Sequence, residues 1–226
     1  MQSGNGEFVE VYLDGSFRIG CAPSLVPAPG QYMLAHPAGS AAPLAEAIFF
    51  VDAAPGGFHA APPLPDSWVL GKSIDLKGPL GRGFALPNSA RKIALIAIDG
   101  PGSRLHGLMR QGMNQNLEIA LISAEPVFDI PEAVEVQPIQ AFRDVVHWAD
   151  FIALDLEWKN FTGLKDLMEG LELIHAVREA QVLIHTLLPC GTLASCGACA
   201  VPVRHGWKMA CKDGPVFRLG DLIGAG

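Results

Sequence analysis

The chain has few basic residues and no long apolar run, and each absence excludes a class of function. It holds 16 Lys and Arg against 23 Asp and Glu among 226 residues, so its formal net charge is −7. This balance lacks the basic surface that attracts a phosphate backbone, so we expect no nucleic-acid partner. No apolar stretch approaches the ~20 residues that a membrane-spanning helix requires, so we expect no membrane span.

The amino terminus lacks the basic start and the apolar core of a signal peptide, since it reads Met-Gln-Ser-Gly-Asn-Gly-Glu. We therefore expect a cytoplasmic protein. In that compartment, clustered cysteines are more often metal ligands than disulfides. Glycine and proline are abundant, at 25 and 18 residues, which favours many turns and short elements.

Hydrophobic periodicity changes near residue 87. Before it, short β-like runs are interrupted by proline and glycine, and no helical period is visible. After it, continuous apolar runs of strand length alternate with helical patterns, which is typical of a parallel α/β layer. The strand-like runs cover residues 92–98, 117–123 and 151–156, and the helical patterns cover 103–113, 142–148 and 164–178. We predict an antiparallel β-barrel over residues 1–86, a parallel α/β layer over 87–180 and a small C-terminal module over 181–226.

Four of the five cysteines fall in this last module, at Cys190, Cys196, Cys199 and Cys211. Three thiols on one loop and a fourth further on is the plant-type ferredoxin layout, C-x4-C-x2-C…C, although the first gap here is one residue longer. Small residues between these cysteines leave room for a cluster and let backbone N–H groups point at its sulfurs. Cys21 stands alone in the β-rich part and is expected to be a small buried apolar residue.

Zinc is the main alternative for these cysteines. Structural zinc sites usually use two C-x2-C pairs, and only Cys196 and Cys199 form one here. We therefore predict a [2Fe–2S] cluster held by all four thiolates, and hence a protein that transfers electrons.

Three motifs give the chain a family resemblance. The stretch Cys211-Lys212-Asp213-Gly214-Pro215-Val216-Phe217, which begins at the fourth predicted ligand, resembles the electron-transfer subunit of two-subunit dihydroorotate dehydrogenases. The stretch Gly78-Pro79-Leu80-Gly81-Arg82-Gly83-Phe84 is similar to the family's loop between its flavin barrel and its nucleotide domain. The stretch Pro29-Gly30-Gln31-Tyr32-Met33-Leu34 resembles the family's Pro-Gly-Gln-Phe strand.

The resemblance implies a ferredoxin-reductase-like fold that works in a hetero-oligomer. In the family, FAD lies between the barrel and the nucleotide domain and is reduced by NADH. Electrons then pass singly through a [2Fe–2S] cluster to FMN in a separate catalytic subunit, where dihydroorotate and orotate interconvert. This chain would then be a non-catalytic electron-transfer subunit of an oxidoreductase with a flavin-containing partner. The alternatives are a degenerate structural adaptor whose metal has no redox role, and a stand-alone ferredoxin reductase.

The family's flavin motif is altered in this chain. The family has an Arg-Pro-(Phe/Tyr)-Ser-like segment after a Pro-Leu pair, and its arginine binds the FAD pyrophosphate. Here Pro43-Leu44 is followed by Ala45-Glu46-Ala47, and a glutamate would repel a pyrophosphate. A loop with three glycines allows close approach to a ligand and equally allows a tight inter-domain turn, so FAD binding stays open. The candidate FAD contacts are Gly78, Pro79, Leu80, Gly81 and Gly83, and Arg82 is a candidate substitute for the lost arginine.

The nucleotide-binding turn is altered as well. A Gly-Gly-Gly-Ile-Gly-like turn in the family is Asp99-Gly100-Pro101-Gly102 here, where Pro101 removes an amide donor and Asp99 adds negative charge. The family's Cys-Gly-Pro turn is replaced by a segment with Asp155 and Glu157, which we expect to be solvated rather than catalytic. The sequence therefore argues against NAD(H) binding.

Overall fold

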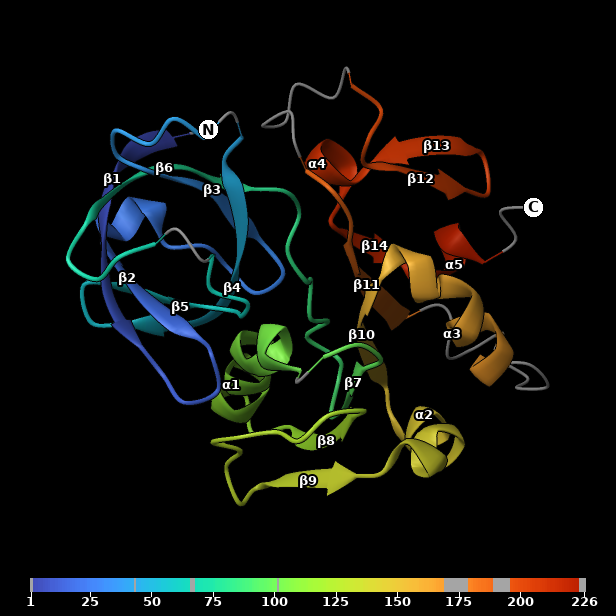
Figure 1. The fold of residues 1–226 in the computed structure, drawn as a ribbon. Coiled ribbons are helices and arrows are strands. Elements are labelled where there is room, and N and C mark those ends of the chain that lie inside the picture. Colours follow the sequence, from blue (N-terminus) through green and yellow to red (C-terminus); the bar gives the residue numbers. More distant parts are fainter. Residues whose placement is uncertain are drawn as a thin grey trace.

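The computed structural model describes residues 2–42, 44–65, 68–100, 102–168, 179–188 and 196–223. The chain forms an N-terminal barrel and a larger α/β part beside it (Figure 1). Among the described residues, no helix is both long and apolar enough to cross a membrane.

The barrel is closed and antiparallel, in the strand order β1-β2-β5-β4-β3-β6. Aromatic side chains fill its interior: the ring centroids of Phe8 and Phe17 lie 5.8 Å apart, and those of Phe17 and Trp68 lie 5.6 Å apart. A barrel of this size is filled by its own side chains, so its interior is a packed core. The strands are β1 (Gln2–Val11), β2 (Phe17–Cys21), β3 (Tyr32–Pro37), β4 (Glu46–Ala54), β5 (Gly57–Ala60) and β6 (Ser73–Leu80), with a 3-10 turn η1 (Pro23–Leu25).

The α/β part is built on a six-stranded sheet in the order β14-β11-β10-β7-β8-β9. All neighbouring pairs are parallel except β14, which runs antiparallel to β11. The strands are β7 (Lys92–Ala97), β8 (Glu118–Ser123), β9 (Val134–Gln137), β10 (Phe151–Glu157), β11 (Ala180–His185) and β14 (Val216–Arg218). The strand-like runs predicted at 92–98, 117–123 and 151–156 are thus confirmed as β7, β8 and β10. They are continuously apolar because both faces of this sheet are covered.

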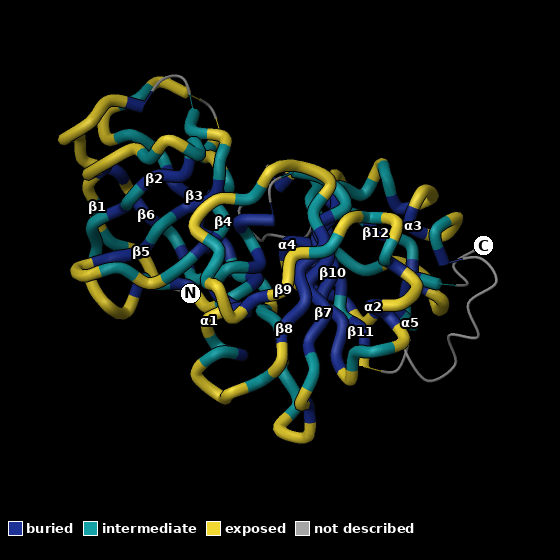
Figure 2. Tube along the Cα trace, turned by 90° about the horizontal axis from the view of Figure 1, so that it is seen from below, coloured by how far each residue is buried: buried dark blue, intermediate teal, exposed yellow. Residues whose placement is uncertain are grey.

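Helices cover the two faces of this sheet. Helix α1 (His106–Asn114) contributes Leu108 and Met109 to one apolar cluster, together with one set of sheet residues. Helices α2 (Phe142–Trp148) and α3 (Phe161–Met168) pack with the alternate set on the other face. Figure 2 shows the central strands as the buried middle of this part of the molecule. The 3-10 turns are η2 (Ser103–Leu105), η3 (Ile139–Ala141) and η4 (Trp158–Asn160).

The C-terminal segment is less separate than the predicted module over 181–226. Strand β11 begins at Ala180 and, with β14, extends the central sheet, because β14 pairs with residues 181–183. The hairpin of β12 (Ala200–Val203) and β13 (Gly206–Met209) forms its own two-stranded sheet. Two short helices, α4 (Ala210–Asp213) and α5 (Leu219–Leu222), flank β14. The predicted 164–178 helix is α3 up to Met168, and the rest of it lies outside the described residues.

The sheet has a topological switch point between β7 and β10. From β7, the chain adds β8 and β9 on one side and then returns to add β10 and β11 on the other. In open α/β sheets, ligands bind beyond the carboxyl ends of the strands at such a point. The residues that follow β7 and end β10 and β11 are therefore the first place to look for function.

Candidate metal centre and switch-point network

Three of the four predicted ligands lie in the described part of the chain. Cys199 directly precedes β12, and Cys211 lies in α4, directly after β13. The β12–β13 hairpin brings these two segments side by side, because Ala210 N donates to Cys199 O at 3.0 Å. Cys199 and Cys211 are buried, and Cys196 is exposed. Cys190 lies outside the described residues.

The cysteines that are described fit one half of a [2Fe–2S] ligand set. Within the described ranges, no three Cys, His, Asp or Glu side chains converge as ligands of one metal ion. A [2Fe–2S] cluster spreads four thiolates over two irons, so it requires two pairs of thiols rather than one group of three or four around a single ion. Cys199 and Cys211 are themselves buried and lie on adjacent segments, so they are suited to be one pair. The two remaining predicted ligands are Cys196 and Cys190.

Backbone contacts shape the segment that carries Cys211. The Asp213 carboxylate accepts from Met209 N at 2.9 Å, which turns β13 into α4 at the ligand position. From the barrel, the Tyr32 hydroxyl donates to Cys211 O over 3.4 Å, a long hydrogen bond. Tyr32, Leu34 and Leu80 of the barrel belong to the same apolar cluster as Cys199 and Cys211. One wall of the barrel therefore packs against the predicted ligand segment.

The three motifs that carry the family resemblance meet at this wall. At Gly81, where φ is +76°, an added Cβ would lie 2.4 Å from Pro215 Cδ. At Gly30, where φ is +84°, it would lie 2.6 Å from Val216 Cγ2. Only glycine accommodates both the positive φ and such contacts. We call this meeting of residues 29–34, 78–84 and 211–217 the motif junction.

Hydrogen bonds also hold the motif junction together. Arg82 N donates to Gly214 O at 2.6 Å, and Phe84 N donates to Pro29 O at 2.9 Å. The Gln31 side-chain amide donates to Gly81 O at 3.1 Å. Segments about 50 and 130 residues apart in sequence are thus tied by their backbones as well as by packing.

The predicted FAD loop falls inside the motif junction. Gly78, Pro79 and Leu80 are part of β6, where Gly78 pairs with Gln2 and Leu80 pairs with Tyr32. An added Cβ at Gly83 would lie 2.5 Å from Pro29 O, so both Gly81 and Gly83 face protein atoms. These contacts account for the glycines as a tight inter-domain turn, and their role in FAD binding stays a prediction.

Arg82, the candidate substitute for the lost arginine, is exposed. It lines a cavity of about 380 Å³ together with Lys208 and Arg218. The Arg82 backbone stabilises the motif junction through its hydrogen bond to Gly214 O.

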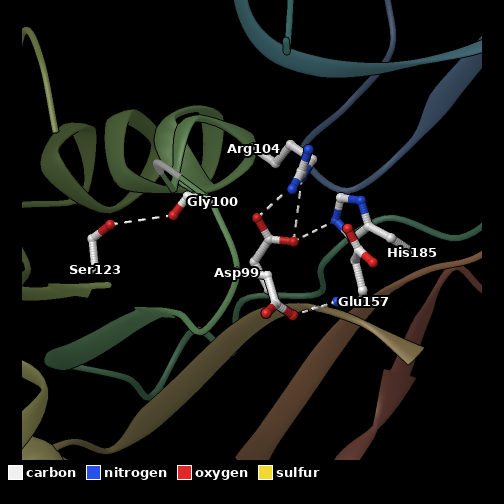
Figure 3. Close-up of polar contacts among 7 residues, drawn as sticks. Asp99, Gly100, Arg104, Ser123, Glu157 and His185 are labelled. Atoms are coloured by element: carbon white, nitrogen blue, oxygen red, sulfur yellow. Dashed lines mark hydrogen bonds and ion pairs between the residues drawn. The ribbon is translucent and has the colours of Figure 1, made fainter. Parts of the chain in front are cut away.

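At the switch point, one buried carboxylate contacts the side chains of an arginine and a histidine (Figure 3). Asp155, near the end of β10, is fully buried, and its Oδ2 lies 3.1 Å from Arg104 Nε. Its other oxygen, Oδ1, contacts His185 Nε2 at the end of β11. We call Arg104, Asp155 and His185 the switch-point network. The prediction that Asp155 is solvated is wrong, because β10 is a central strand between β7 and β11.

Electrostatics explain how Asp155 stays charged. Burial raises the pKa of this carboxyl, and the charges and hydrogen bonds of Arg104 and His185 lower it. The balance holds the pKa below its usual value. A buried charge persists only where it is paired and hydrogen-bonded in this way.

The switch-point network also contacts the barrel. The His185 ring stacks on Phe49 of β4, with centroids 4.8 Å apart. Phe49 in turn lies 5.7 Å from Tyr32, centroid to centroid. Aromatic contacts therefore run from the switch point to the motif junction.

The two other acids near this point have different surroundings. The Asp99 carboxylate accepts from Glu157 N at 2.8 Å and from the Asn160 amide at 2.6 Å, so it closes the end of β10. Glu157 pairs with Lys159 at the surface, and its side chain is 45% exposed. Its pKa is lowered mainly by the hydrogen bond from Lys159.

The sequence analysis missed Arg104, His185 and Phe49. Arg104 and His185 could have been found from their positions, because one follows β7 and the other ends β11.

These features define a ferredoxin-reductase-like fold with a cysteine-rich C-terminal segment. The NADH-dependent reduced ferredoxin-NADP oxidoreductase, described in connection with flavin-based electron bifurcation, matches with a TM-score of 0.74 at 19% identity, over 96% of this chain and 88% of that one. The ferredoxin reductase of carbazole 1,9a-dioxygenase matches with a TM-score of 0.61 at 16% identity, over 81% and 69%. The predicted fold class is confirmed.

The sequence comparisons are more specific. Residues 186–223 match the iron–sulfur cluster binding domain of dihydroorotate dehydrogenase B. The electron transfer subunit of dihydroorotate dehydrogenase B (NAD(+)) from Bacillus cereus strain Q1 is 25% identical, and that from Geobacillus sp. strain WCH70 is 26% identical. Each match covers 68% of this chain and 66% of the relative, so the chain spans about two thirds of their length. The chain is thus similar to these electron-transfer subunits, and the predicted resemblance is confirmed.

Proposed function

We propose that this chain is an electron-transfer subunit that passes single electrons through a [2Fe–2S] cluster to or from a flavin-containing partner. The observation that carries the proposal is the match of residues 186–223 to an iron–sulfur cluster binding domain. Within this matched range of the chain, Cys199 and Cys211 are buried and lie on adjacent segments. The similarity to electron transfer subunits of dihydroorotate dehydrogenase B supports a catalytic partner of that type. The chain would then work in a hetero-oligomer in the cytoplasm, where thiols stay reduced.

The residues have separate tasks in this proposal. Cys190, Cys196, Cys199 and Cys211 would hold the cluster, which when bound supplies one-electron chemistry. The buried positions of Cys199 and Cys211 keep water from one side of it, and solvent exclusion is one of the factors that set a reduction potential. Cys196 lies at the exposed rim, which suits exchange of electrons with a docked partner.

The proposed route requires only the cluster, and FAD bound in a modified manner stays a prediction. The glycines of the 78–84 loop face protein atoms, and Glu46 stands near where the resemblance requires a cationic pyrophosphate contact. At the switch point, both oxygens of Asp155 are engaged by Arg104 and His185. These groups do not fit the usual flavin and nicotinamide sites, so we assign the chain no hydride or substrate chemistry.

Anaerobic purification followed by metal analysis tests the proposal. We expect brown protein with about two iron and about two acid-labile sulfide per chain. Cys199→Ser is expected to lose the visible absorption, because it removes a buried thiolate ligand. Cys21→Ser is the matched control, since Cys21 lies at the end of β2 in the barrel. Colourless protein with stoichiometric zinc, or an unchanged spectrum in Cys199→Ser, would show that the chain is a structural adaptor or that the ligands are misassigned.

A further inference from the structure

The barrel contacts the predicted cluster ligand Cys211 directly, although its strands are distant in sequence. Tyr32 is fully buried in β3, and its hydroxyl reaches the carbonyl of Cys211, 179 residues further along the chain. The contact is made to the backbone carbonyl of the ligand residue rather than to its side chain. A hydrogen bond at this point holds the peptide from which the thiolate projects.

The motif junction makes this contact rigid. Gly81 packs against Gly214 and Pro215, which lie three and four residues beyond Cys211. It also packs against the Tyr32 ring, because a Cβ added at Gly81 would lie only 3.2 Å from Tyr32 Cε1. Arg82 N fixes the Gly214 carbonyl at 2.6 Å. The peptide of Cys211 is therefore held on one side by Tyr32 and, through Gly214, by the 78–84 loop.

Groups that contact metal ligands orient them and tune the metal, and removing such a group typically costs 10–100-fold in metal affinity. We propose that the barrel is the positioning scaffold of the cluster, and that Tyr32 and Gly81 are positioning residues that set the geometry of the Cys211 thiolate. This inference rests on the proposed function, because it takes Cys211 to be a ligand. It gives the barrel a task that does not depend on carrying a flavin.

The barrel wall at this point supports such a task. Tyr32, Leu34 and Leu80 share one apolar cluster with both Cys199 and Cys211, so water is excluded from the contact. The barrel interior forms a different cluster, around Phe8, Phe17 and similar residues. A substitution at the wall therefore acts on the ligand segment without opening the barrel core.

Tyr32→Phe tests the hydrogen bond, because it removes the hydroxyl and keeps the ring. We expect iron to be released to a chelator about 10-fold faster than from the unaltered protein, with shifted g values of the reduced cluster in electron paramagnetic resonance. Tyr12→Phe is the matched control, since Tyr12 lies on the far hairpin of the barrel and bonds to His59. Unchanged g values and iron release in Tyr32→Phe would overturn the role of Tyr32.

Gly81→Ala tests the packing, and Gly56→Ala separates packing from backbone strain. Both glycines have positive φ, at +76° and +71°, but Gly56 has no atom within 4 Å of an added Cβ. We expect Gly81→Ala to alter the cluster spectrum and Gly56→Ala to leave it unchanged. If Gly81→Ala does not fold, Tyr32→Phe still decides the matter. A wild-type protein without a cluster would refute the proposed function, whereas an intact cluster that neither Tyr32→Phe nor Gly81→Ala affects would refute only this inference.

Discussion

The motif junction and the switch-point network both link the barrel to the α/β part, but they do so by opposite means. The junction uses glycines, backbone hydrogen bonds and apolar contact around Tyr32. The network uses charged side chains around the buried Asp155 and reaches the barrel through the stacked rings of His185 and Phe49. The junction carries the residues that resemble a family, and the network carries residues that depart from it.

This difference shows that two contacts between the same parts of a fold can be built in one place by close packing and in another by polar side chains. The carboxyl ends of parallel strands at a switch point leave room that a ligand usually fills. Here the side chains of Arg104 and His185 lie at these strand ends and contact Asp155. Near the predicted ligand segment, in contrast, close packing leaves little freedom for change, because an added Cβ at Gly81 would collide with backbone and proline atoms.

The largest effect is expected from breaking the switch-point network. Asp155→Asn removes the carboxylate that contacts both Arg104 and His185, and it leaves the largely buried Arg104 guanidinium without this counter-charge. Breaking a buried pair in this way costs about 3–5 kcal/mol of the free energy of unfolding. Denaturant unfolding of the variant would measure it, with the exposed Asp75→Asn as the control.

The same variant also tests whether the two regions are independent. We expect Asp155→Asn to keep the visible spectrum of the cluster, because its contacts do not include the ligand segment. The double variant Arg104→Met with Asp155→Leu should recover much of the lost stability, since apolar replacement of a buried pair is often neutral. A changed cluster spectrum in Asp155→Asn would mean that the aromatic contacts couple the network to the junction.

The sequence predicts the fold better than it predicts the switch-point network. Alternating and continuous apolar runs indicate the barrel and the covered sheet because they reflect burial on one or both faces of a strand. The burial of Asp155 depends on which strands flank β10, and local patterns do not encode strand order. The contact of Tyr32 with Cys211 joins residues 179 positions apart, so spacing rules cannot find it. The cysteines are recognisable because three of the four predicted ligands lie close together in the sequence.

A smaller effect is expected at a third contact between the barrel and the α/β part. His59 of the barrel and His106 of α1 line a cavity of about 160 Å³, near Asp52 and Arg110. Burial lowers the pKa of both histidines, and nearby aspartates offset it only in part. In the unfolded chain each histidine has a pKa near 6.5, whereas in the folded chain its pKa is lower. The free energy of unfolding is therefore highest above about pH 6.5 and falls as the pH drops toward 5.

His106→Leu is therefore expected to flatten the pH dependence of stability between pH 7 and 5. A single group contributes at most about 1.4 kcal/mol per pH unit, and the slope from His59 remains. Unfolding midpoints measured across this range provide the check, with the exposed His147→Leu as the control. If the pH dependence of the unfolding midpoint is unaltered in His106→Leu, the responsible titration lies elsewhere in the chain.

The smallest effect is expected at Glu157, two residues after Asp155 on the same strand. Both carboxylates face a cation, but Lys159 is fully exposed, so its pair with Glu157 competes with water and salt. Glu157→Gln should leave the denaturation midpoint unchanged in dilute buffer and in high salt alike. Because the two acids share a strand end and differ mainly in burial, a large loss in Glu157→Gln would show that strand position, rather than burial, makes Asp155 important.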